Sequence, residues 1–191
     1  MAVKSKWDAA RHLVSGAGGA LDPKPVSDSQ SEITQMVLPN DANPMGNILG
    51  GMVMHQVDIV AAIAAGRHSG SYVVTASMDR MIFRVPIRVG EIIILKASVN
   101  RAFRTSMEVG VKVFREGVYN RQREHTSSAY LTFVAVDDDG NPREIPPVVP
   151  VTADERRRYR EAGVRRKQRL EEAALRKAKF ARGAQRSGAS R

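Results

Sequence analysis

Residues 46–66 are mostly apolar, and this stretch constrains the fold more than any other part of the chain. Apolar residues on most sides of a helix are typical of one that is wrapped by a sheet. Two features are unusual there. Gly50 and Gly51 stand within the stretch, although glycine inside a helix costs about 1 kcal/mol relative to alanine. Asp58 stands among Met, Val, Ile and Ala, where a carboxylate needs partners. A helix that tolerates both features indicates a functional site.

The helix is expected to begin near Gly46 or Asn47, with Asn47 as N-cap, and to end at Gly66. Alternating apolar residues and bounding turn formers predict one strand before it and four strands after it. The strands are expected at 32–38, 72–85, 91–101, 107–114 and 128–136. This order predicts an α+β fold.

The length of 191 residues suits a single domain, expected over residues 31–151, and no internal repeat is found. Residues 1–30 contain Gly-rich and Pro/Ser-rich patches and are predicted to be a flexible leader. Thr152 and Glu155 form a capping box that opens a basic helix, expected over 152–182 on the surface, although Gly163 weakens it. Residues 183–191 are predicted to be disordered.

Charge and residue usage exclude several classes of protein. Of the 30 Lys and Arg and the 20 Asp and Glu, residues 152–191 hold 14 and 5, so this tail carries +9 of the net charge of +10. Cysteine is absent, which excludes disulfides, thiol catalysis and Cys-ligated zinc. No run approaches the roughly 18 apolar residues of a membrane span, and no secretory signal is found, so a cytoplasmic protein without a membrane partner is expected. Motifs such as G-x-S-x-G, the P-loop and H-E-x-x-H are also absent.

Residues 39–58 resemble the central helix region of the hotdog-fold acyl-CoA thioesterases, in particular the cytosolic acyl-CoA hydrolase family. Residues 75–91 resemble the family's second strand and its F-x-x-P-I-x-V-G-D/E turn. Residues 104–107 resemble its G-R-T/S-S-M turn, with Phe103 where many relatives have glycine. The resemblance extends over about residues 32–172. Within residues 39–58 the matching positions are Pro39, Asn43, Gly46, Gly50, Gly51, Met54 and Asp58.

The resemblance implies one hotdog domain, a long central helix wrapped by a five-stranded antiparallel sheet, that hydrolyses acyl-CoA to CoA and a carboxylic acid. It implies that Asn43 orients the thioester carbonyl or the attacking water, and that Asp58 is a general base or a nucleophile. Neither a metal nor an organic cofactor is implied. The remaining substrate contacts expected are Gly50, Gly51, Thr75, Arg104, Thr105 and Ser106.

A site shared between two subunits is expected from the helix geometry. Asp58 about 11 residues into the helix would lie roughly 17 Å from Asn43 and the helix start. Antiparallel helices in a two-fold dimer place the start of each beside the middle of the other, so the two side chains can meet across the interface. The family resemblance implies the same arrangement, with homodimers assembled into a hexamer.

Other interpretations stay open at this point. His55 lies three residues before Asp58 on much the same helix face, but no second histidine or carboxylate is spaced for a metal. A non-catalytic hotdog protein is the alternative, one that binds acyl-CoA or nucleic acid through the basic helix. Against nucleic acid, the helix has few aromatic residues.

Overall fold

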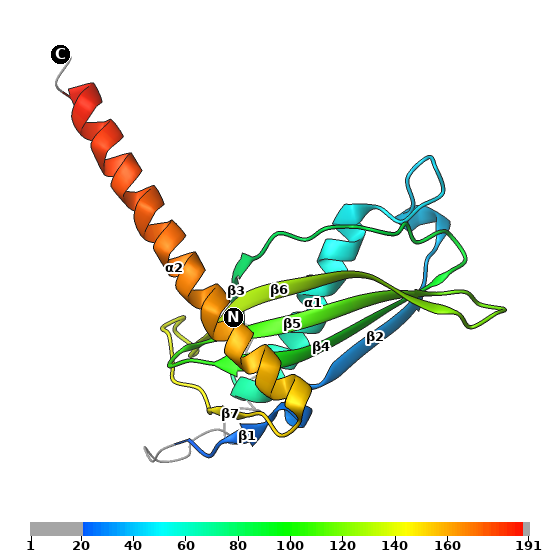
Figure 1. Cartoon of the computed structure of the whole chain (residues 1–191), viewed down its shortest axis with the longest axis horizontal. Coiled ribbons are helices and arrows are strands. Elements are labelled where there is room, and N and C mark those ends of the chain that lie inside the picture. Colours follow the sequence, from blue (N-terminus) through cyan, green and yellow to red (C-terminus); the bar gives the residue numbers. More distant parts are fainter. Residues whose placement is uncertain (1–20, 189–191) are drawn as a thin grey trace, which may run out of the picture.

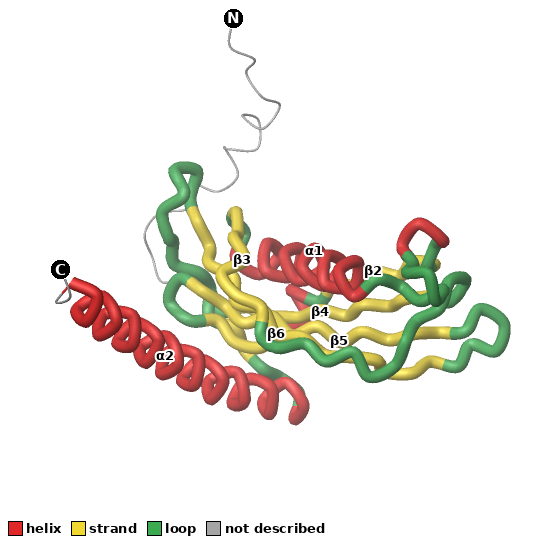
Figure 2. Tube along the Cα trace, turned by 90° about the horizontal axis from the view of Figure 1, so that it is seen from above, coloured by secondary structure: helices red, strands yellow, loops and turns green. Residues whose placement is uncertain are grey.

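The computed structural model describes residues 21–188, with side chains described for residues 21–177. Figure 1 shows a five-stranded antiparallel sheet in the order β2-β4-β5-β6-β3, with the long helix α1 along it. In Figure 2, α1 lies on one face of the sheet and α2 on the opposite face. This architecture confirms the predicted α+β hotdog fold with a C-terminal helix. The main elements are β2 (Ser31–Met36), α1 (Gly50–Ser69), β3 (Tyr72–Met78), β4 (Ile92–Ala102), β5 (Ser106–Glu116), β6 (Arg123–Val136) and α2 (Ala153–Gly188).

The core lies between α1 and the inner face of the sheet. Alternate residues of β4 and β5 point to this face, because side chains alternate along a strand, and Leu95, Val99 and Val109 are fully buried there. Val57 and Val60 are among the α1 residues that pack against them. The opposite side of α1 stays open, and Met54, Ile59 and Ile63 are exposed on it. The sheet of one chain therefore covers only part of the apolar helix surface.

The boundaries predicted for α1 are wrong at both ends. Leu49 is the N-cap, and Asn47 belongs to the preceding loop, where it forms a β-bridge with Arg88. At the other end the helix continues through Gly66 to Ser69, and Gly70 ends it in the left-handed conformation with φ 64°. Asn47 and Gly66 are residue types typical of helix ends, and the prediction relied on them. The start of the helix depends instead on backbone pairing between Asn47 and the distant Arg88, which a local pattern does not reveal.

The strands also differ in length from the prediction. β3 ends at Met78 and does not reach Val85, because the chain leaves the sheet after a bulge between Thr75 and Ser77. β6 begins at Arg123, five residues before the expected start, and pairs with an equally extended β5 as far as Glu116. β3 and β2 form the two edges of the sheet.

The prediction of a flexible leader over residues 1–30 is wrong for its last part. Lys24–Pro25 forms a short strand, β1, parallel to β7 (Val148–Val149), and Val26–Ser29 forms the 3-10 helix η2. Val26 is 2% exposed, and the hydroxyl of Ser29 accepts a hydrogen bond from the backbone N–H of Val99 at 2.9 Å. Residues 1–20 lie outside the described residues. A second short 3-10 helix, η3, spans Pro39–Asp41.

The C-terminal helix α2 is longer than expected and is docked on the sheet by its first half. It continues to Gly188, so residues 183–188 are helical, in contrast to the predicted disorder, and residues 189–191 lie outside the described part. Figure 1 shows that its second half extends beyond the sheet. None of the helices described is both long and apolar enough to cross a membrane.

A buried ionic cluster holds α2 to the outer face of the sheet. Glu108 of β5 is 0% exposed and accepts hydrogen bonds from Arg165, Arg169 and Asn100, the closest at 2.7 Å. Arg169 also bonds Asp79 at 2.7 Å, just after the end of β3. Burial by itself raises the pKa of Glu108, but the hydrogen bonds from Arg165, Asn100 and Arg169 outweigh it and hold that pKa below its ordinary value. The carboxylate is therefore charged and joins α2 to two strands.

We predict that Glu108→Gln lowers the free energy of unfolding by about 3 kcal/mol, because removing one partner leaves buried charge unmatched. For a chain of this size the melting temperature should fall by roughly 6–12 °C, measured at fixed protein concentration. Glu124→Gln is the control, because Glu124 is half exposed and pairs with Arg115 at the surface. Its cost should stay below about 1 kcal/mol, and an equal loss in the two variants would contradict the role given to Glu108.

The same carboxylate predicts how stability depends on pH. The pKa of Glu108 is lower in the folded chain than in the unfolded chain, where it is about 4.3. Its stabilising contribution is therefore fully present above about pH 4.3 and is lost as the pH falls through the folded-state value. Urea unfolding from pH 7 to pH 3 should show the difference between wild type and Glu108→Gln narrowing below about pH 4.3. A difference that stays constant over this range would exclude a titrating Glu108 as its source.

Candidate active site

Asn43 organises the loop that leads into α1. Its Oδ1 accepts hydrogen bonds from the backbone N–H groups of Met45 (3.0 Å) and Asn47 (3.2 Å). Its own N–H donates to the carbonyl of Asn47 at 2.8 Å, and Gly46 completes the turn with φ 75°. None of the described residues accepts a hydrogen bond from Nδ2 of Asn43, so this amide group is available to donate to a ligand.

A cavity of about 330 Å³ opens beside this loop and the first turn of α1. Gly50 lies against the ring of Phe83 there, and a Cβ at Gly50 would stand 3.5 Å from that ring, in ordinary contact. A Cβ at Gly51 would meet nothing within 4 Å. Within one chain, neither glycine is required for close packing. The cavity is lined by Asn43, Asn47, Ile48, Gly50, Val53, Phe83, Arg84, Val85, Pro86, Ile87, Thr126 and Ser127.

Asp58 lies on the open side of α1 and is held by Thr75. The Thr75 hydroxyl donates to Asp58 Oδ1 at 2.8 Å, which joins the helix to the edge strand β3. The β3 bulge at Ala76 directly follows Thr75, and a bulge re-aims the side chains beside it. Asp58 lies eight residues after Gly50, about 12 Å along the axis, and not 17 Å as expected from the earlier helix start.

Arg104 and Thr105 lie in the turn between β4 and β5, and Ser106 is the first residue of β5. Phe103 N–H donates to the Ser106 carbonyl at 2.8 Å, and Phe103 is not among the residues with positive φ, so the turn forms without the glycine that many relatives have. The Arg104 side chain is mostly exposed and lies 3.5 Å from Glu144. Ser106 Oγ accepts a hydrogen bond from Arg166 of α2 at 2.9 Å.

The predicted site residues thus fall in three places within one chain. Asn43 and Gly50 border one cavity, Asp58 and Thr75 form a pair farther along α1, and residues 104–106 lie beside α2. His55 is exposed, and no described residue forms a hydrogen bond with it. No group of three or more His, Cys, Asp and Glu within the described residues is arranged to hold a metal ion.

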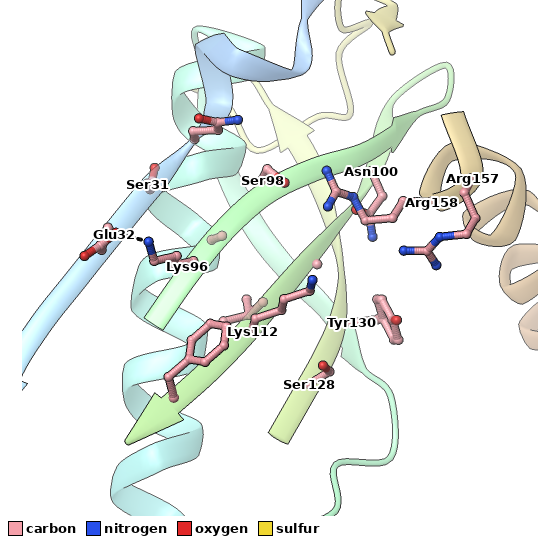
Figure 3. Close-up of a pocket in the computed structure, with 15 residues that line it drawn as sticks. Ser31, Glu32, Lys96, Ser98, Asn100, Lys112, Ser128, Tyr130, Arg157 and Arg158 are labelled. Carbon is pink, nitrogen blue, oxygen red and sulfur yellow. Dashed lines mark ion pairs between the residues drawn. The ribbon is translucent and has the colours of Figure 1, made fainter. Parts of the chain in front are cut away.

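A larger groove of about 520 Å³ lies on the outer face of the sheet and contains none of the predicted site residues. Figure 3 shows Glu32 and Lys96 on the β2 side of the groove, and Arg157 and Arg158 reaching it from α2. Glu32 pairs with Lys96 at 3.0 Å, and Arg157 and Arg158 both pair with Asp154. Most of the cationic groups there are therefore neutralised within the chain.

The roles of Arg101, Arg165, Arg166 and Arg169 were missed at the sequence level. The basic helix was expected to lie on the surface, but its Arg165, Arg166 and Arg169 contact the sheet or the segment next to it. Arg101 of β4 lies beside them, against Phe103. Glu108 could have indicated these contacts, because an acid within a strand of alternating valines requires a positively charged or hydrogen-bonding partner.

Comparison with known proteins shows which family this chain resembles. Residues 45–121 match the model of the thioesterase superfamily. Acyl-coenzyme A thioesterase 11 of Mus musculus is 41% identical over 149 residues, which are 77% of this chain but 25% of the mouse protein. The uncharacterized acyl-CoA thioester hydrolase YkhA of Bacillus subtilis is 40% identical over 64% of this chain and 71% of its own length. The chain thus spans a quarter of the mouse protein and most of the bacterial one.

Solved structures agree in fold over nearly their whole length. An acyl-CoA hydrolase from Bacillus cereus has a TM-score of 0.79 and 35% identity, covering 82% of this chain and 96% of that one. The Staphylococcus aureus acyl-CoA hydrolase in complex with butyryl coenzyme A, coenzyme A and coenzyme A disulfide has a TM-score of 0.76 and 37% identity, covering 83% and 98%. An apo-hexameric acyl-CoA thioesterase has a TM-score of 0.78 and 40% identity, covering 81% and 99%.

The chain is 35–40% identical to these solved structures, covers nearly all of each of them and has the same fold. The chain belongs to the thioesterase superfamily, among the hotdog-fold acyl-CoA hydrolases.

Proposed function

We propose that this chain hydrolyses acyl-CoA thioesters to free CoA and a carboxylic acid, with Asp58 as general base or nucleophile. The observation that carries the proposal is the Thr75–Asp58 hydrogen bond of 2.8 Å on the open side of α1, in a chain of the acyl-CoA hydrolase family. A carboxylate held by a hydroxyl group at a fixed place on a rigid helix is suited to activate water.

Structures of variants of the S. aureus enzyme support this choice of residues. In separate structures, an asparagine, an aspartate and a threonine of that enzyme are each replaced by alanine, and these positions are separated by 15 and then 17 residues. Asn43, Asp58 and Thr75 are separated by the same two intervals. The complex of that enzyme with butyryl coenzyme A supports the substrate class.

The proposed reaction uses the start of α1 to hold the thioester. The N–H groups of the first turn at Gly50 and Gly51 have no acceptor within the helix, and the positive end of the helix dipole lies there. With the free Nδ2 of Asn43 they can stabilise the negative charge that develops on the carbonyl oxygen. If Asp58 acts as a base, it takes a proton from water as the water oxygen adds to the carbonyl carbon. The C–S bond then breaks, and the proton passes to the departing sulfur.

We infer that the complete site is shared between two subunits of a homodimer. Asp58 lies about 12 Å along α1 from the helix start. At that separation, the Asp58 carboxylate and the helix start of a single chain cannot both act on one carbonyl group. The open side of α1 and the edge strand β3 expose Met54, Ile63, Tyr72 and Val74, with Tyr72 58% and Val74 50% exposed. A partner chain seated there would bury these side chains and bring the start of its own α1 to Asp58. Assembly into a hexamer is supported by two hexameric relatives.

The remaining parts of the proposal concern the surroundings of the enzyme. No metal or organic cofactor is needed for this chemistry, because a carboxylate and backbone N–H groups suffice. The turn at Arg104, Thr105 and Ser106 is proposed to contact CoA. Relatives named cytosolic acyl coenzyme A thioester hydrolases support a cytoplasmic location. The alternative is a non-catalytic protein that binds acyl-CoA or nucleic acid through α2, and it is weakened because Arg165 and Arg169 are engaged with Glu108.

We predict that Asp58→Asn lowers kcat by about a hundredfold or more, because it keeps the shape of the side chain and removes the base. Release of free thiol from short- to long-chain acyl-CoAs measures this and also gives the chain-length preference. Turnover that survives the substitution would overturn the role of Asp58. No turnover by wild type on any chain length would overturn the proposed activity.

We predict that Thr75→Val lowers kcat by about tenfold or more, because the hydrogen bond that orients Asp58 is lost while the side-chain volume is kept. Thr75→Ser retains the hydroxyl and should keep most of the activity. The measurement is kcat and KM for both variants on the best substrate. A Thr75→Val variant that kept its activity while Thr75→Ser lost it would show that the methyl group rather than the hydroxyl of Thr75 is the important part.

A further inference from the structure

Two arginines at the junction of α2 and the β4–β5 turn have no carboxylate partner within the described part of the chain. The side chain of Arg101, near the end of β4, donates no hydrogen bond to any described residue, and its Nε is buried. Arg166 of α2 donates only to the hydroxyl oxygen of Ser106. Their neighbours differ, because Arg165 and Arg169 are bonded to Glu108, and Arg169 also to Asp79. Of these four arginines, only Arg101 and Arg166 therefore lack a carboxylate partner within the described residues.

Aromatic rings hold these two guanidinium groups. Arg166 lies over the ring of Phe103 at 3.9 Å from its centroid, and Arg101 lies 5.5 Å from the same centroid. Arg101 also lies over Tyr159 of α2 at 4.4 Å. Cation–π contacts stabilise a guanidinium through its face and leave its N–H groups free to donate in the plane.

The helix is shaped to admit Arg101. Gly163 stands inside the first half of α2, where glycine weakens a helix, and a Cβ at this position would collide with Nη1 of Arg101. The glycine that seemed unfavourable in the sequence thus gives space to an unpaired guanidinium. A partly buried guanidinium without a carboxylate partner destabilises the folded chain, and a bound anion would offset that cost.

The charges also act against each other. Burial, followed by the charges of Arg169 and Arg101, lowers the pKa of Arg166. Like charges brought together in a partly buried place repel each other, and a bound anion would relieve that repulsion. The hydroxyl of Ser106 contributes as well, because its oxygen accepts from Arg166 and its proton remains free to donate.

We propose that Arg101, Arg166 and Ser106 form a binding site for a phosphate group carried by a small molecule. A carboxylate is saturated by a single bidentate arginine, whereas a phosphate has enough oxygens for two guanidinium groups and a hydroxyl. The site adjoins Arg104 and Thr105, so one source of the phosphate is the CoA part of the substrate, and that source rests on the function proposed above. The other source is a separate phosphate-bearing ligand.

Binding of pyrophosphate tests the site without any need for catalysis. Isothermal titration calorimetry at constant ionic strength compares the full-length wild type with Arg101→Met and Arg166→Met, which keep much of the side-chain stem. The expected result for a site that takes a separate ligand is at least tenfold weaker binding by both variants. Arg157→Met is the matched control, because Arg157 is on the same helix and already pairs with Asp154 and Glu161, and its affinity should be unchanged.

Gly163→Ala separates loss of the site from loss of folding. The added methyl group favours the helix and displaces the Arg101 guanidinium while keeping its charge. We expect an unchanged or higher melting temperature together with weaker anion binding. Anion binding equal to that of wild type would overturn the part assigned to Arg101.

Binding of CoA and 3′-dephospho-CoA, measured with the same variants, identifies the source. If the site takes the 3′-phosphate of CoA, wild type binds CoA at least tenfold more tightly than 3′-dephospho-CoA, and this ratio falls to about one in Arg101→Met and Arg166→Met. If the site takes a separate ligand, only pyrophosphate binding responds to the variants. Affinities for all three probes within twofold of wild type in both variants would overturn the site. Stronger binding of a single-stranded oligonucleotide than of any of these probes, lost in the same variants, would overturn the small-molecule assignment.

The outcome for the site is distinct from the outcome for the enzyme. A wild type that binds these probes and releases no thiol would refute the proposed hydrolysis and keep the anion site. A wild type that hydrolyses acyl-CoA through Asp58, with variants of Arg101 and Arg166 unaltered in all binding measurements, would keep the enzyme and refute the site.

Discussion

The packing of α1 against a single antiparallel sheet is the constraint on which the rest of the structure depends. A helix buries one side against one sheet, and here that side carries Val57, Val60 and Ala61, all fully buried. The other side carries apolar residues that the same chain leaves open, and Asp58 lies at this margin beside Thr75 of the edge strand. The position of the carboxylate thus follows from how much of the helix one sheet can cover.

A second interaction attaches α2 and connects distant parts of the chain. Glu108 is buried beneath α2, and Arg169 bonds both this carboxylate and Asp79, which directly follows β3. The edge strand that carries Thr75 is therefore tied to the C-terminal helix. Arg165 additionally stacks on Tyr130 of β6 at 3.7 Å. The arginines of α2 thus have two roles. Arg165 and Arg169 attach the helix to the sheet, and Arg166 belongs to the proposed phosphate site.

Much of the fold was predictable from local patterns, and the errors have identifiable causes. The alternation in β4 and β5 and the apolar run of α1 report burial directly, so element order and fold class followed from them. The start of α1 did not, because Asn47 looks like an N-cap but its N–H is bonded by Asn43, and the backbone there pairs with Arg88. The early end of β3 depends on a bulge at Ala76 that carries no distinct local signal. Ser29, a residue of a segment that looks like a mobile leader, is buried because its hydroxyl bonds the backbone of Val99.

The sequence by itself determined the helix with its glycine pair and single acid, the order of the strands, the family and the residues to examine. These properties depend on residue type and spacing along the chain. Only the tertiary structure decided that Thr75 bonds Asp58, that Glu108 anchors a helix some 60 residues later in the chain, and that Arg101 and Arg166 meet at Phe103. Such contacts join residues far apart in sequence, and they arise because sheet pairing and burial bring those residues together, which no local pattern records.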